Sequence, residues 1–199
     1  MDGDRAGGLS RRELITGTVA VGATAALVAP AARADTPPES DPTLLSKALV
    51  LERLSVLAYT ALIPLPALSA HERRVLRTLV RQDRAHVRAL EAEMTARGIA
   101  LPPAPNGPAA LDQTLSAKGM SAALAGVKTL KQTVQLLLDI EALTQGGYYM
   151  IIREASDPAL ALRAAQVLAN EAQHSTLLTE LVSPEITQTV PGWYVTGVT

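Results

Sequence analysis

Two short stretches, Asp83-Arg84-Ala85-His86 and Glu171-Ala172-Gln173-His174, decide the fold of this chain. In each, an acidic residue precedes a histidine by three positions, so both side chains project from the same side of a helix. A single glutamate lies upstream of each stretch, Glu52 before the first and Glu141 before the second. All six residues fall on apolar helical stripes that should face a core, where an unpaired carboxylate costs several kcal/mol. Two divalent metal ions would remove that cost, so the sequence predicts a dinuclear metal site.

The composition favours helices and limits the chemistry of the site. The chain has 199 residues, enough for one domain with a core, and it is 48% hydrophobic but only 3% aromatic, with no phenylalanine. Such a mixture suits packed helices better than strands. The formal net charge of −1 gives no reason to expect a nucleic-acid partner. Because cysteine is absent, a transition-metal site must use carboxylates and histidines.

Residues 1–34 have the pattern of a twin-arginine export signal. Paired arginines in the stretch 10–15 precede a weakly apolar run over 14–29, and small residues at 32–34 suit signal peptidase. A helical membrane anchor of similar length is the alternative, although Pro30 and several Gly and Thr residues disfavour it. We therefore expect export to the periplasm, the cell envelope or the extracellular space, with a membrane contact only if the signal is kept as an anchor.

The rest of the chain divides into a linker (35–40), a helical domain (41–183) and a C-terminal tail (184–199). Asp41-Pro42 predicts the N-cap and first turn of one helix, which the prolines in 63–66 end. Ser69-x-x-Glu72 predicts a capping box at the start of the second helix. That helix ends at Gly98 and the prolines that follow.

The third and fourth helices follow a long connection. About twenty irregular residues are expected before the third helix, which should begin near 116–121. Asp157-Pro158 repeats the N-cap and proline pattern for the fourth helix, and Pro184 ends it. Connections that are short, long and short predict an all-α, antiparallel four-helix bundle with one long crossover between helices 2 and 3.

Four carboxylates and two imidazoles suit iron or manganese better than other metals. Zinc is a weaker candidate, and magnesium or calcium seldom binds two histidines. The alternative is a metal-free polar core, in which nearby arginines form salt bridges with the carboxylates. The four arginines that lie next to the stripes mostly project away from them: Arg53, Arg84, Arg88 and Arg153.

The order of a lone Glu, an acid-x-x-His pair, a second Glu and Glu-x-x-His resembles the ferritin-like di-iron carboxylate superfamily over residues 41–183. With the export signal, the chain is most similar to the twin-arginine-exported bacterial ferritin-like domain proteins. The resemblance implies that Asp83 and Glu171 bridge two metals, and that each metal has a terminal glutamate and one histidine. The terminal ligands would be Glu52 and Glu141, with His86 and His174. Asp83 departs from the family, which usually has Glu at this position, so bridging here is in question.

The resemblance also implies reaction of two iron ions, or an Fe/Mn pair, with dioxygen or peroxide. We expect oxidase, ferroxidase or peroxide-detoxifying activity. Tyr59 and Tyr148 each lie one heptad after a ligand glutamate, so either could contact a ligand or donate an electron; filling the core is the alternative.

Two other functions stay open from the sequence. A metal-free structural or envelope-stress protein would keep the pattern as a polar network, and an iron-storage protein would need a multi-subunit cage. A homodimer is also open.

The second helix is expected to carry a face of arginines, which could contact anionic lipid, cell wall or another subunit, or simply be solvated. This face comprises Arg73, Arg77, Arg81, Arg84 and Arg88.

Overall fold

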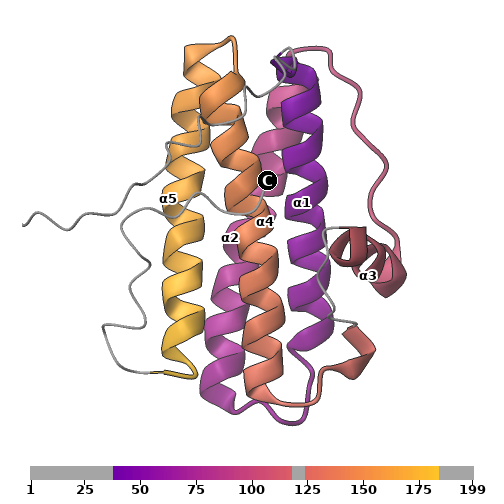
Figure 1. Cartoon of the computed structure of the whole chain (residues 1–199), viewed down its shortest axis with the longest axis vertical. Coiled ribbons are helices and arrows are strands. Elements are labelled where there is room, and N and C mark those ends of the chain that lie inside the picture. Colours follow the sequence, from indigo (N-terminus) through magenta and orange to yellow (C-terminus); the bar gives the residue numbers. More distant parts are fainter. Residues whose placement is uncertain (1–37, 118–123, 184–199) are drawn as a thin grey trace, which may run out of the picture. The chain divides into compact units, whose positions relative to one another are not determined.

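The computed structural model describes residues 38–117 and 124–183, and all regular structure within these ranges is helical. Four long helices lie side by side as a bundle (Figure 1): α1 (Asp41–Leu62), α2 (Ala70–Ala96), α4 (Leu130–Glu154) and α5 (Pro158–Glu180). The predicted all-α bundle is therefore confirmed. The export signal and the tail predicted at the two ends of the chain lie outside the described residues.

Short turns join α1 to α2 and α4 to α5, so the two helices of each pair are antiparallel. The connection from α2 to α4 instead runs along the bundle and returns to the end where α2 began (Figure 1). Helix α1 packs against both α2 and α4, and α5 packs against α4 and α2. None of the described helices has the length and apolar character needed to cross a membrane.

Capping interactions fix the ends of the bundle helices. Ser69 Oγ accepts a hydrogen bond from Glu72 N (3.3 Å), and the Glu72 carboxylate accepts one from Ser69 N, which confirms the predicted capping box. Asp157 accepts a hydrogen bond from Ala159 N (2.8 Å) at the start of α5. Gly98, just after α2, has a φ of +67°, which glycine adopts without steric cost.

The start of α1 differs from the prediction by one residue. Ser40 is the N-cap, and Asp41 already lies in the first turn. The Asp41 carboxylate instead accepts hydrogen bonds from the backbone N of Ser156 (2.8 Å) and of Asp157 (3.2 Å). It thus ties α1 to the turn between α4 and α5, a tertiary contact that local sequence does not reveal.

The third bundle helix is present, but its predicted start near 116–121 is wrong. This helix, α4, begins at Leu130 after a capping box in which Thr129 accepts a bond from Gln132 N (3.2 Å). The connection before it is not irregular, because it contains helix α3 (Gly107–Ala117) and the short 3-10 helix η2 (Leu124–Gly126). Helix α3 packs on α1 through Leu111 and Leu115, which are buried. Thr-x-x-Gln was the sequence signal that marked the true start.

Buried polar side chains form a layer between two apolar clusters. On each bundle helix the candidate ligands lie between members of one cluster and members of the other. Tyr59 belongs to the first cluster and Tyr148 to the second. The core therefore holds its polar groups in the middle of the bundle, shielded from water at both ends.

Helices α1 and α4 approach closely beside this layer. A Cβ atom at Gly147 would lie 2.9 Å from Leu51 Cδ1, closer than side chains pack. Gly147 costs α4 roughly 1 kcal/mol relative to alanine, and a side chain at this position would require the end of the Leu51 side chain to shift.

Candidate metal centre

All six predicted ligands point into the polar layer, from four different helices. Glu52 comes from α1, Asp83 and His86 from α2, Glu141 from α4, and Glu171 and His174 from α5. Five of them are at most 1% exposed, whereas the His86 side chain is 14% exposed. The helical spacing alone placed these residues correctly on the inner faces.

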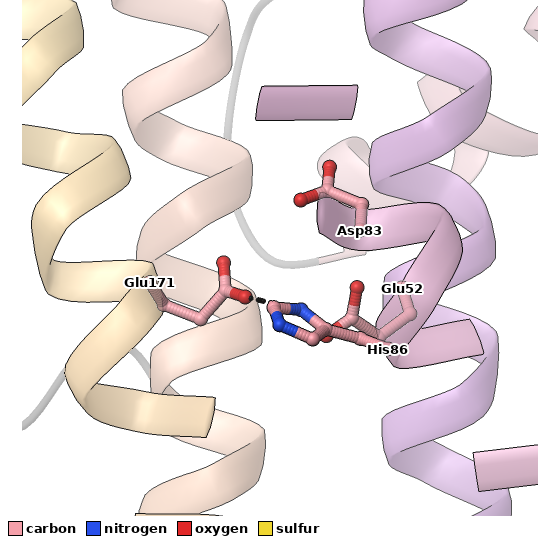
Figure 2. A group of neighbouring side chains, drawn as sticks. All are labelled: Glu52, Asp83, His86 and Glu171. Carbon is pink, nitrogen blue, oxygen red and sulfur yellow. Dashed lines mark ion pairs between the residues drawn. The ribbon is translucent and has the colours of Figure 1, made fainter. Parts of the chain in front are cut away.

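One group of four ligands surrounds His86. Figure 2 shows Glu52, Asp83, His86 and Glu171 pointing toward one another, and one donor atom of each lies within 4.8 Å of the others. His86 Nδ1 is 2.9 Å from Glu171 Oε1 and 3.3 Å from Glu52 Oε1. Two helices from the first half of the chain and one from the second therefore meet at a single point.

A second group surrounds His174. Donor atoms of Asp83, Glu141 and His174 also lie within 4.8 Å of one another. His174 Nδ1 is 3.3 Å from Asp83 Oδ1, 3.5 Å from Glu141 Oε1 and 3.4 Å from Glu171 Oε2. The two imidazole rings are stacked with centroids 6.3 Å apart.

Asp83 and Glu171 lie between the two histidines. Glu171 presents one carboxylate oxygen to each histidine, and Asp83 belongs to both groups despite its shorter side chain. This is the placement that bridging ligands require, so the missing methylene of Asp83 does not take it out of reach of either group.

One polar atom of each predicted ligand is buried without a hydrogen-bond partner. Among the described residues, these six atoms are the buried side-chain N and O atoms left unsatisfied: Glu52 Oε2, Asp83 Oδ1, His86 Nδ1, Glu141 Oε2, Glu171 Oε1 and His174 Nδ1. Leaving a buried polar atom unpaired costs about 1–3 kcal/mol, and more for a charged group. Cations among these atoms would satisfy all six at once, so the residues present fit a metal pair.

The carboxylates and histidines perturb one another strongly without metal. Burial, followed by the neighbouring Glu171 carboxylate, raises the pKa of Asp83 to about 7. Burial also raises the pKa of Glu52 and Glu141 above the usual range. These carboxyl groups hold protons where a metal would hold them ionised.

The pKa shifts of the two histidines and of Glu171 instead favour the charged form of each group. Burial would lower the pKa of both imidazoles, but the adjacent carboxylates outweigh burial. They raise the pKa of His86 to about 10 and that of His174 to about 11. The pKa of Glu171 is lowered in spite of burial, because both histidines lie beside it. Four carboxylates thus compete for cations, and two divalent ions with neutral imidazoles would balance their charge.

The arginines do not form the salt-bridge network considered from the sequence. Arg53 pairs with Glu91 (2.8 Å), Arg84 donates to Thr60, and Arg153 lies over the Tyr149 ring. No ion pair or hydrogen bond joins the Arg88 side chain to any described residue. Within the described part of the chain, no arginine neutralises the six ligands.

The two tyrosines contact the ligands, but each reaches the glutamate of the other helix. Tyr59 on α1 donates a hydrogen bond to Glu141 Oε1 on α4 (2.6 Å). Tyr148 on α4 donates to Glu52 Oε1 on α1 (2.6 Å). Burial raises the pKa of both phenols well above the usual value, so they remain protonated donors. Each hydrogen bond fixes one oxygen of a glutamate and leaves the other free.

Two further polar side chains hold the ligands, and the sequence did not assign a role to either. Ser55 donates a hydrogen bond to Asp83 Oδ2 (2.7 Å), which leaves Oδ1 facing the centre. Gln82 Oε1 lies 2.8 Å from His174 Nε2 and accepts a hydrogen bond from it, which orients the ring with Nδ1 facing the carboxylates. Ser55 lies on the same helical stripe as Glu52, which was a usable signal, whereas Gln82 carried none.

Comparison with known proteins agrees with this fold. The family model described as Ferritin-like domain matches residues 40–184, well over half of the chain. The chain therefore belongs to the ferritin-like family, which confirms the superfamily resemblance seen in the sequence. No curated protein and no solved structure matches it significantly.

Proposed function

We propose that this ferritin-like protein holds two iron ions, or one iron and one manganese ion, in the polar layer of the bundle. The observation that carries the proposal is the convergence of six unsatisfied buried atoms, one from each of the six predicted ligands. Oxygen donors with two imidazoles are the ligand set that iron and manganese prefer.

Each ligand has a distinct role in the proposed centre. Asp83 and Glu171 would hold both ions, because each carboxylate reaches the two groups. Glu52 with His86 would hold one ion, and Glu141 with His174 would hold the other. Tyr148 and Tyr59 orient the terminal glutamates, and Ser55 orients Asp83.

A metal pair of this kind supplies electrons to dioxygen or peroxide when bound, so we propose oxidase, ferroxidase or peroxide-detoxifying activity. The chain's own contribution is to hold the ligands in fixed positions and to exclude bulk water. Apolar clusters lie on both sides of the layer, and five of the six ligands are fully buried. Small oxidants reach such a centre more easily than large substrates do.

Metal content tests the proposal directly. The full-length protein, purified without chelator and reconstituted anaerobically with Fe(II), should contain about two metals per chain and consume oxygen. His86→Ala and His174→Ala should each lose metal, whereas His71→Ala, at an exposed histidine, should not. A folded protein that binds no metal would overturn the proposal and favour the metal-free structural function.

We also propose that the protein is exported by the twin-arginine route. The support is the Arg11-Arg12 pair, the apolar run that follows and the small residues at 32–34. Replacing both arginines with lysine should keep the protein in the cytoplasm, as cell fractionation would show. Unchanged export of this variant would contradict the proposal.

A further inference from the structure

Helices α1 and α2 also form a groove on their outer faces, on the opposite side from the metal centre. It consists of two adjoining depressions, with cavity volumes of about 630 Å³ and 440 Å³, that share Thr60 and Arg84. Both volumes lie within the range of about 300–1,000 Å³ typical of ligand pockets. We call the two together the arginine groove.

A line of arginines forms the α2 side of the groove: Arg74, Arg77, Arg81, Arg84 and Arg88. They recur at steps of three and four residues, so their guanidinium groups follow one stripe of the helix over about 21 Å. The face predicted from the sequence included Arg73 instead of Arg74. In the structure, Arg73 donates hydrogen bonds to the backbone O of Ile63 (3.3 Å) and Leu65 (2.9 Å), beyond the end of α1.

No carboxylate neutralises this line within the described residues. Arg81 and Arg84 donate hydrogen bonds only to the Thr78 and Thr60 hydroxyls, at 3.1 and 3.3 Å. The guanidinium groups of Arg74, Arg77 and Arg88 form no ion pair or hydrogen bond within the described residues. Like charges one helical turn apart repel one another. A bound anion would remove that repulsion, and guanidinium groups bind phosphate oxygens in a bidentate manner.

The two depressions differ in polarity. The first contains four of the arginines and two threonine hydroxyls, which suits a phosphate group. The second is lined largely by apolar side chains, among them Val56, Leu57, Val87 and Pro105. A ligand that occupies both therefore needs an anionic head and an adjoining hydrocarbon part.

We propose that the arginine groove binds an anionic phospholipid, with the headgroup phosphate among the arginines and acyl carbons in the second depression. The bundle would thereby attach to the surface of an anionic membrane through one face. A nucleic acid fits less well, because no aromatic side chain lines either depression to stack on bases. This inference is independent of the metal centre, whose ligands face the opposite side of α1 and α2.

Vesicle co-sedimentation of the full-length protein tests the proposal. We expect binding to vesicles of phosphatidylglycerol with phosphatidylcholine, weaker binding to phosphatidylcholine alone, and loss of binding at high salt. The double variant Arg77→Glu/Arg81→Glu should bind the anionic vesicles at least about tenfold more weakly than the wild type. Ala104→Asp, which places a charge in the apolar depression, should also weaken binding.

A matched control separates the groove from charge in general. Lys128→Glu/Lys131→Glu makes the same change in charge at exposed positions near the start of α4 and should bind like the wild type. Every variant keeps residues 1–34, so any contribution from that segment is common to all. Circular dichroism and an unchanged iron content would show that the fold is intact.

Three results would overturn the proposal. The first is equal vesicle binding by the wild type and the Arg77/Arg81 variant, which would assign binding to another part of the chain. The second is tighter binding to duplex DNA than to anionic vesicles at the same salt concentration, which would make the groove a nucleic-acid surface. The third is loss of binding in both double variants alike, which would assign binding to general charge.

Discussion

The α1–α2 half and the α4–α5 half of the metal centre use the same pattern but hold it differently. In order, the equivalent residues are Glu52 and Glu141, Ser55 and Thr144, Tyr59 and Tyr148, Asp83 and Glu171, and His86 and His174. Ser55 donates to Asp83, whereas Thr144 donates to the backbone O of Glu141 in its own helix (2.9 Å). The half with the shorter carboxylate, that of Asp83, is the half in which a hydroxyl holds that carboxylate in place.

The histidines of the two halves differ as well. His174 is fully buried and bonded to Gln82, whereas the His86 side chain is 14% exposed. The position beside His86 is therefore nearer to solvent, and we expect its metal to exchange first. An internal repeat thus need not give two equivalent sites, because each half has its own supporting contacts.

The largest expected effect comes from removing the ligand that joins the halves. Glu171→Ala should lose both metals and the associated oxygen consumption, because Glu171 lies beside both histidines. Elemental analysis after anaerobic Fe(II) reconstitution measures this, with the exposed Glu180→Ala as the control. Retention of one metal would show that the halves bind independently.

The opposite pKa shifts of Asp83 and Glu171 predict a pH dependence of the metal-free protein. Asp83 has a folded pKa of about 7, above its unfolded value, so the folded state binds more protons and loses stability as pH rises through this range. Glu52 and Glu141 act in the same direction, while Glu171, already ionised, does not oppose it above pH 5. Between pH 5 and 7 the melting temperature should fall by roughly 5 °C.

Metal should reverse this trend. Bound cations replace the protons, so the stabilisation by added Fe(II) should grow with pH over the same interval. Scanning calorimetry with and without metal measures both curves. The fall in melting temperature of the metal-free protein should be smaller in Asp83→Asn. A metal-free protein whose stability does not depend on pH would contradict the assigned pKa shifts.

Removing the hydroxyl that holds Asp83 should have a moderate effect. Ser55→Ala should weaken iron binding about tenfold, the lower end for residues that orient ligands. Thr144→Val is the matched control, since that hydroxyl contacts only its own helix. In the Ser55→Ala background, Asp83→Glu should recover iron affinity because the longer side chain reaches further. If affinity does not recover, Ser55 does not compensate for the shorter side chain of Asp83.

The smallest effects should come from the crossed tyrosines. Tyr148→Phe removes the hydrogen bond to Glu52 and should weaken binding of the metal beside His86 severalfold. Tyr59→Phe removes the hydrogen bond to Glu141 and should weaken binding of the metal beside His174. Stepwise anaerobic Fe(II) titration by calorimetry resolves the two sites. Tyr149→Phe, which changes the ring beneath Arg153, should alter neither. Effects on the same half as each tyrosine would contradict the crossing.

The sequence by itself determined the bundle, the capping box at Ser69 and the inward direction of all six candidate ligands. These features depend on spacings of three and four residues within one helix, where the geometry is fixed by the backbone. The start of α4 was predicted too early, although the capping box from Thr129 to Gln132 was a local signal for it. Helix α3 was missed because only Leu111 and Leu115 mark its buried side.

Only the tertiary structure decided which residues support the centre and what the outer surface offers. The crossing of Tyr59 and Tyr148, the contact of Ser55 with Asp83 and that of Gln82 with His174 all join different helices. The arginine groove likewise needs α1 beside α2. Such contacts depend on the rotation and axial offset of one helix relative to its neighbour, which packing of the whole core sets and a single helical stripe does not encode.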